Sequence, residues 1–304
     1  MDKHSHYSQR ERVQRTIRHE KTDRLPKGEL CITDSIIRSK LICNKVGFEE
    51  RLAFINQLGL DIFTISPTFP HIKSRLPDPA EYEWPDIDKW ANQTSIFTFA
   101  IIDGAFETGL QTYDYSDFLT LPNKSPKDLK DFIKQVEKLN IATIKQASDQ
   151  GIDGIILADD VAYTRGLLTN PKILREYFFP SLAKQVEEIT RLGLPVFYHC
   201  DGDYHEIIPD LINMHMQGLQ CIEPNCGMDI AVLQKEYGDK LCLWGHIDTK
   251  DTHNARKTAF LKTFSASLQD LSTQNGIILG TNCGLYDGID IEGLTRSEEH
   301  TSEL

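Results

Sequence analysis

The sequence lacks an excess of basic residues and lacks any long apolar run. Its 304 residues hold 33 Lys and Arg against 45 Asp and Glu, which is a formal net charge of −12. Binding of phosphate backbones needs a basic face, so nucleic acid is not an expected partner. No run of about 18 apolar residues occurs, so no membrane span or membrane partner is expected. The polar N-terminus does not resemble a secretory signal peptide.

Two local motifs are also missing. The seven cysteines are odd in number and irregularly spaced, without a Cys-x-x-Cys pair. This spacing favours reduced thiols over a disulfide framework and predicts a cytoplasmic location. No Gly-x-Gly-x-x-Gly follows an apolar run, so a dinucleotide site is not expected.

Apolar runs of strand length alternate with longer amphipathic stretches along the chain. Five runs in the second half each end in Asp, His, Glu or Cys and then Gly or Pro. Buried parallel strands appear as unbroken apolar runs, and barrel enzymes collect polar groups at the carboxyl ends of their strands. The pattern therefore predicts an α/β fold, a (β/α)8 TIM barrel. The five runs are 154–157, 195–198, 218–222, 241–244 and 276–279.

The first half is less regular. Strands are expected at 25–30, 61–66 and 95–102, and helices at 8–18, 48–58 and 125–150. Residues 68–95 hold four prolines with Trp84 and Trp90, and we interpret this segment as an excursion over the barrel. The two tryptophans are expected to pack beneath it.

Several segments resemble the uroporphyrinogen decarboxylase superfamily in order, over about residues 9–294. Such a resemblance implies a barrel with one of two chemistries, decarboxylation of uroporphyrinogen or transfer of methyl groups. The matching segments are 10–19, 23–26, 159–160, 170–180, 198–203, 222–224, 227–229, 237–238 and 245–248.

The resemblance is closer to the corrinoid-dependent methyltransferases of this superfamily than to the true decarboxylases. Decarboxylases carry Arg-Gln-Ala-Gly-Arg after the first strand, where this chain has Lys27-Gly-Glu-Leu-Cys-Ile-Thr33. Members that methylate thiols carry His-x-Cys on strand five and a Cys after strand eight. His199 and Cys283 match that pattern, whereas Asp201 stands in place of the middle Cys. The resemblance therefore implies a metal site of His199, Asp201 and Cys283, with zinc as the metal.

The expected function is thus transfer of a methyl group between a small donor and a corrinoid protein or a thiol. The expected partners are a small-molecule substrate, a corrinoid protein and a second copy of the chain in a homodimer. Two alternatives stay open. One is a uroporphyrinogen decarboxylase that needs no cofactor, and the other is a non-catalytic ligand-binding barrel.

Other polar residues at the expected strand ends are candidates for the remaining roles. Asp160, Tyr163 and Asp248 are candidate catalytic residues, and Asp103 and Glu223 are candidate substrate-binding residues. Each also has a purely structural alternative, such as a helix cap, a salt bridge within the barrel or packing on the rim.

The last nine residues, 296–304, read RSEEHTSEL. This string matches the in-frame translation of a common sequencing adapter. We therefore expect a single barrel domain over residues 1–295, with a non-native tail after it and a barrel truncated after strand eight.

Overall fold

The computed structural model describes residues 7–70, 75–254, 271 and 274–295. The expected non-native tail at 296–304 lies outside these residues, and the domain division stays a prediction. No helix in the described part of the chain is long and apolar enough to cross a membrane.

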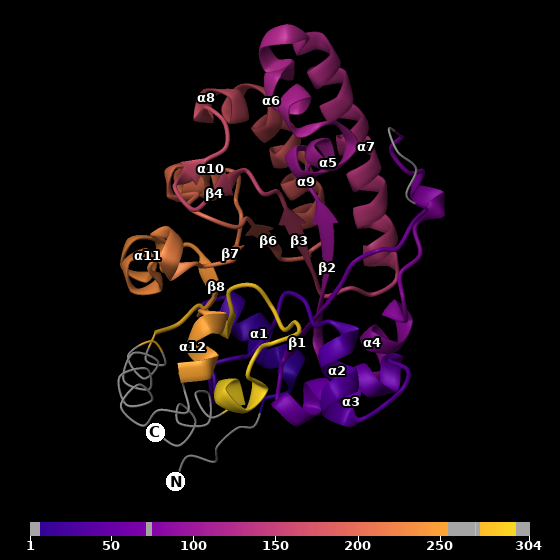
Figure 1. Cartoon of the computed structure of the whole chain (residues 1–304), viewed down its shortest axis with the longest axis vertical. Helices are drawn as coiled ribbons and strands as arrows, with labels where there is room; N and C mark the ends of the chain where they lie inside the picture. Colours follow the sequence, from indigo (N-terminus) through magenta and orange to yellow (C-terminus); the bar gives the residue numbers. More distant parts are fainter. Residues whose placement is uncertain (1–6, 71–74, 255–270, 272–273, 296–304) are drawn as a thin grey trace.

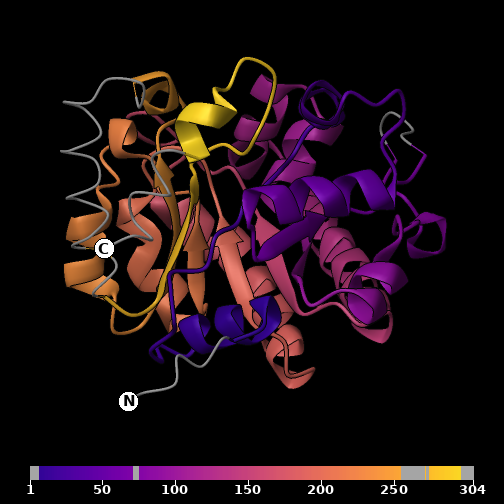
Figure 2. The same cartoon turned by 90° about the horizontal axis from the view of Figure 1, so that it is seen from below.

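The fold is α/β and is built on a parallel seven-stranded sheet that curls round on itself (Figures 1 and 2). Its strand order is β1-β2-β3-β6-β7-β8-β9, and a separate antiparallel hairpin consists of β4 and β5. The strands are β1 (Ile62–Ile65), β2 (Phe97–Asp103), β3 (Gly154–Ala158), β4 (Ala162–Tyr163), β5 (Gly166–Leu167), β6 (Val196–His199), β7 (Gly218–Gln220), β8 (Cys242–Ile247) and β9 (Ile277–Thr281).

Helices surround the sheet, as Figures 1 and 2 show. They are α1 (Gln9–Ile17), α2 (Asp34–Leu41), α3 (Phe48–Leu58), α4 (Ile87–Gln93), α5 (Ala105–Thr112), α6 (Tyr115–Lys124), α7 (Pro126–Asp149), α8 (Pro171–Ile173), α9 (Phe179–Arg191), α10 (Ile208–Asn213), α11 (Ile230–Tyr237) and α12 (Thr249–Asn254). Short 3-10 helices are η1 (Pro79–Glu81), η3 (His205–Ile207) and η4 (Pro224–Cys226), and η2 (Leu174–Phe178) is a π-helix between α8 and α9. The predicted helix at 125–150 agrees with α7, where Pro126 occupies the first turn as its fixed φ favours.

Residues 26–28 lie between the two edge strands of the sheet, β9 and β1. Gly28 N donates to Leu279 O at 2.9 Å, and Asp61 N donates to Lys27 O at 2.7 Å. Parallel bridges join Lys27 to Leu279 and Gly28 to Ile62. Backbone pairing therefore continues from β9 through this eighth segment to β1, where a strand was predicted at 25–30. Truncation of the barrel after the strand predicted at 276–279, which was counted as strand eight, stays a prediction.

The amino-terminal end of the barrel is filled by apolar side chains. Val13 and Ile17 of α1 belong to one buried cluster with Phe97, Phe197 and Trp244 from the strands. This packing closes the interior of the barrel at that end. The carboxyl ends of the strands, which we call the mouth of the barrel, are where barrel enzymes keep their chemistry.

The proline-rich excursion packs through its tryptophans, as predicted. Trp90 stacks on Phe63 with ring centroids 4.0 Å apart, and both Trp90 and Trp84 are buried. The indole nitrogen of Trp84 donates to Gln146 Oε1 at 3.1 Å and so attaches the excursion to α7. This arrangement holds the segment beside the end of β2.

Candidate functional site

The register between neighbouring strands aligns several residues at the mouth of the barrel. Asp103 at the end of β2 pairs with Ala158 of β3, which pairs with His199 of β6. His199 in turn pairs with Gln220 of β7. Parallel strands lie about 4.8 Å apart, so these side chains occupy neighbouring positions on one arc of the mouth.

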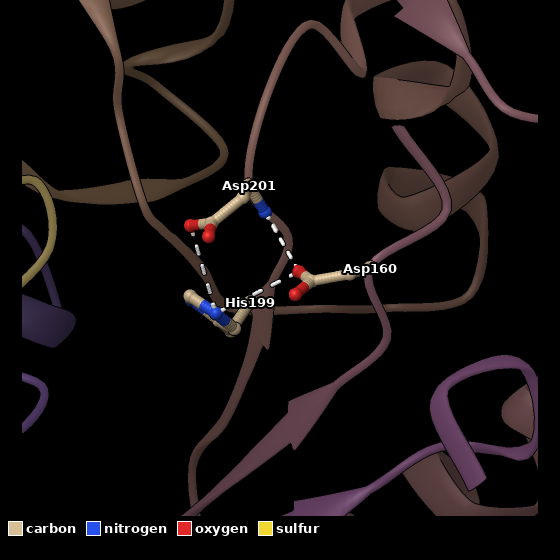
Figure 3. Close-up of side chains that lie close together, drawn as sticks. All are labelled: Asp160, His199 and Asp201. Atoms are coloured by element: carbon tan, nitrogen blue, oxygen red, sulfur yellow. Dashed lines mark hydrogen bonds and ion pairs between the residues drawn. The ribbon is translucent and has the colours of Figure 1, made fainter. Parts of the chain in front are cut away.

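His199 lies at the centre of a group of three metal-ligating side chains (Figure 3). Its Nε2 is 3.8 Å from Asp160 Oδ1 and 3.9 Å from Asp201 Oδ1. The backbone N–H of Asp201 donates to Asp160 Oδ1 at 2.8 Å, which fixes the two carboxylates relative to each other. The His199 ring is buried, whereas Asp201 reaches solvent. We call this set the His199 group.

The other ring nitrogen of His199 has a hydrogen-bond partner on the neighbouring strand, β7. Nδ1 contacts Oε1 of Gln220, a fully buried side chain on the next strand. An amide oxygen can only accept a hydrogen bond, so this contact puts the proton on Nδ1. The lone pair of Nε2 then faces the two carboxylates, as in metal sites where an outer hydrogen bond orients the histidine.

A second set of donor atoms shares Asp201 with the first. Asp201, Cys221 and Glu223 offer ligand atoms that lie within 4.8 Å of one another. The buried thiol of Cys221 donates to the Asp201 carboxylate. Glu223 Oε2 accepts from Gly202 N at 2.7 Å, and its Oε1 accepts from Asn282 Nδ2 at 3.4 Å. One imidazole, three carboxylates and a thiol therefore converge at one edge of the mouth.

The mouth is strongly acidic. Burial raises the pKa of Asp201, and the charges of Asp160 and Glu223 raise it further, while His199 lowers it. Burial also raises the pKa of Asp103 and of Glu107, and Asp160 adds to both shifts. Since like charges and desolvation both disfavour ionised carboxylates, a cation bound here would relieve the repulsion.

Comparison with known proteins now decides the family. The sequence profile described as Uroporphyrinogen decarboxylase (URO-D) matches residues 95–302. This chain belongs to the uroporphyrinogen decarboxylase family. No curated protein matches it.

Solved structures share the fold of this URO-D family chain. A methyltransferase from Methanosarcina mazei superposes with a TM-score of 0.74 at 14% identity, covering 98% of this chain and 99% of the other. A D-allulose 3-epimerase from Methylomonas sp. superposes with a TM-score of 0.51 at 12% identity, covering 92% and 98%. At such low identities these likenesses show a common architecture only.

The structure brings together some of the predicted metal ligands of this URO-D family chain but not all. His199 and Asp201 lie together, and Asp160, which was assigned to catalysis, joins them as a donor. Cys283 belongs to neither group among the described residues. Its carbonyl oxygen is 3.5 Å from Cys31 Sγ, and burial with the charge of Glu223 raises the pKa of its thiol to about 12.

The other predicted residues occupy the rim. Tyr163 lies in β4 and is 49% exposed. Asp248 Oδ1 accepts from Lys250 N at 2.8 Å at the start of α12, and its other oxygen accepts from Asn225. Asp248 therefore serves as a helix cap, the structural alternative noted for such residues. Catalytic roles for both residues stay predictions.

Three contributors to the site were not singled out from the sequence. Cys221 stands two residues before Glu223, and this spacing places side chains on one face of an extended segment. That signal could have identified it. Gln220 carried no comparable signal, because its role depends on its alignment with His199 across two strands. Glu107 lies on α5 and reaches Asp103 only through Gln111, whose Nε2 donates to both carboxylates at 3.0 Å.

Asp159, next to the His199 group, leads to a pH-dependent prediction. Its buried carboxylate accepts from Glu107 N at 2.8 Å, and burial raises its pKa from 3.8 to about 8. The folded protein therefore binds this proton more tightly than the unfolded chain, so the free energy of unfolding falls as pH rises from about 4 to about 8. Asp159→Asn should weaken this dependence and make the variant relatively more stable above pH 8. Urea denaturation at pH 5, 7 and 8.5 measures the effect.

The exposed Asp131 on α7 supplies the control for that measurement. Asp131→Asn should leave the pH dependence of the wild type unchanged. Equal slopes of stability against pH in wild type and Asp159→Asn would contradict the assignment.

Proposed function

We propose that this chain is a methyltransferase that moves a methyl group between a small donor and a corrinoid protein or a thiol, assisted by zinc. The observation that carries the proposal is the convergence of Asp160, His199 and Asp201 at the mouth, with the Nε2 lone pair facing both carboxylates. Membership of the URO-D family and a methyltransferase of the same architecture support it.

The donor set fits zinc. Zinc bonds to nitrogen and carboxylate oxygen are about 2.1 Å long, so two such ligands of a tetrahedral ion lie about 3.4 Å apart. The separations of 3.8 and 3.9 Å from Nε2 are too long for hydrogen bonds and exceed that value only slightly. Cys221 and Glu223 supply further donors beside Asp201. His199, Asp160 and Asp201 would therefore hold the ion.

Bound zinc would polarise the leaving atom of a methyl donor or lower the pKa of a thiol acceptor. The protein's own groups would do the rest. Gln220 keeps His199 in one orientation and tautomer, and the backbone N–H of Asp201 holds Asp160. The surrounding carboxylates would disfavour anionic ligands and favour neutral or cationic ones.

The structure supports decarboxylation of uroporphyrinogen less well. A tetracarboxylate substrate needs cationic groups at the mouth. The segment after the first strand instead presents Glu29, which is buried and accepts hydrogen bonds from the backbone and side chain of Thr281. Together with Asp160, Asp201 and Glu223, this carboxylate makes the region unfavourable for a polyanion.

Methyl transfer from methylcobalamin to a small thiol tests the proposal. The purified protein, loaded with one equivalent of Zn²⁺, is expected to demethylate methylcobalamin in the presence of 2-mercaptoethanol, as followed by visible absorbance. A chelator should stop the reaction, and added Zn²⁺ should restore it. Decarboxylation of uroporphyrinogen without methyl transfer would overturn the proposal in favour of the decarboxylase. Zinc binding with neither reaction would favour a non-catalytic barrel.

A further inference from the structure

A pocket lies around the carboxyl end of β2, beside the His199 group and under the proline-rich excursion. Its walls come from the excursion, from the inner and outer faces of β2, and from α5 and α7. The residues that matter for its chemistry are Phe69, Arg75, Tyr82, Asp103 and Gln111.

Two aromatic rings and a carboxylate share this pocket. Phe69 and Tyr82 lie with ring centroids 4.8 Å apart at 50°. The charge of Asp103 acts on Tyr82 and, together with burial, raises the pKa of its hydroxyl to about 12. Aromatic faces attract cations through their quadrupoles, and a nearby carboxylate adds direct attraction. This combination of groups is typical of sites for quaternary ammonium ions.

The charged side chains that line the pocket are Arg75 and Asp103. Arg75 is bound by both carboxylate oxygens of Glu81, at 2.7 and 2.6 Å, so its charge is compensated within the excursion. Asp103 is bonded by the neutral amide of Gln111, which it shares with Glu107. With Arg75 paired to Glu81, the pocket carboxylate of Asp103 is left with the uncharged donor Gln111, and a cationic ligand would supply its counter-charge.

The pocket is close to the His199 group. Asp103 pairs with Ala158, and Ala158 pairs with His199, so the two side chains start two strand spacings apart. That separation is about 10 Å between backbones. An ammonium group held at Asp103 would therefore place its methyl groups on the same arc of the mouth as the proposed zinc ligands.

We infer that this pocket binds a methylated ammonium group, and that the small methyl donor of this chain is a cation of that class. In the transfer, the bond between methyl carbon and nitrogen breaks as the carbon bonds to a thiolate or to the Co(I) ion of a reduced corrinoid, and a neutral amine leaves with the electron pair. The identity of the bound group rests on the aromatic pair and Asp103 alone. Its role as a donor rests on the proposed methyl transfer.

Calorimetric titration with choline and with 3,3-dimethylbutan-1-ol tests the inference. The alcohol has the shape of choline without its charge, so the pocket should bind choline at least about tenfold more tightly, as expected for a partly desolvated cation on aromatic rings. Equal affinity for the two compounds, or no binding of choline, would overturn the inference.

Substitutions of pocket residues test whether choline binds in this pocket. Asp103→Asn and Tyr82→Leu should each weaken choline binding about tenfold or more, while Tyr82→Phe, which keeps the ring, should retain most of it. Tyr115→Leu is the matched control, because Tyr115 is 55% exposed on α6 and outside the pocket. Choline affinity that survives both Asp103→Asn and Tyr82→Leu would place the ligand elsewhere and refute the assignment.

The same titration separates this inference from the proposed function. Choline should bind equally to chelator-treated wild type and to His199→Ala, because neither change touches the aromatic pair. Choline binding without transfer of a methyl group from choline to a thiol or a reduced corrinoid would refute the donor role and leave the pocket assignment intact. Methyl transfer from methylcobalamin to 2-mercaptoethanol without choline binding would refute the pocket assignment alone.

Discussion

His199→Ala is expected to abolish stoichiometric zinc binding, with a loss of affinity of at least about 100-fold. Removing an outer hydrogen bond to a ligand already costs about 10- to 100-fold, and this variant removes the nitrogen ligand itself. Asp160 and Asp201 would remain, but two carboxylates form a harder, weaker site for zinc. Competition of the purified variant with a chromophoric zinc chelator measures the affinity.

The exposed His205 provides the control for zinc binding. It lies in η3, and its Nε2 is 3.1 Å from Glu236, away from the His199 group. His205→Ala should bind zinc as the wild type does. A graded test is available at Gln220, where Leu should weaken zinc binding about 10- to 100-fold while Glu, which keeps an acceptor, should largely preserve it. Unchanged zinc affinity in His199→Ala would refute the metal assignment.

Asp61→Ala is expected to destabilise the fold by about 3–5 kcal/mol, the range for breaking a buried ion pair by removing one partner. Asp61 is fully buried and accepts from Arg12 Nη1 at 2.6 Å, from Arg24 at 2.7 and 2.9 Å, and from Lys27 N at 2.8 Å. The variant leaves Arg12, which is 5% exposed, with only part of its counter-charge. It also removes a connection between α1, the closing segment at residues 26–28 and β1. Urea denaturation followed by circular dichroism measures the loss.

A surface ion pair supplies the comparison. Asp210 accepts from Arg175 at 2.9–3.1 Å, and both side chains are partly exposed. Asp210→Ala should cost less than about 1 kcal/mol, because solvent screens exposed charges and side-chain entropy opposes the pair. Similar losses in the two variants would show that the buried network adds no more than a surface pair.

The sequence alone determined the strands and the polar residues that follow them. The runs at 154–157 and 276–279 are β3 and β9 within one residue or two, because strands buried on both faces must be continuously apolar. The bounds of α7 and the packing of Trp84 and Trp90 were likewise readable, since a proline in the first turn of a helix and burial of aromatic rings depend on local sequence. The mouth proved acidic, as pKa shifts of its carboxyl groups through neighbouring charges indicate.

Only the tertiary structure decided which of the polar residues meet. His199 lies between Asp160 and Asp201 and over Gln220, whereas Cys283, at the end of a strand farther round the barrel, joins neither donor group in the described chain. The pocket beside Asp103 also needs the excursion folded back over the end of β2. Spacing along a strand gives the face of each side chain, but its neighbours on other strands depend on register and closure, which are set by packing of the whole barrel.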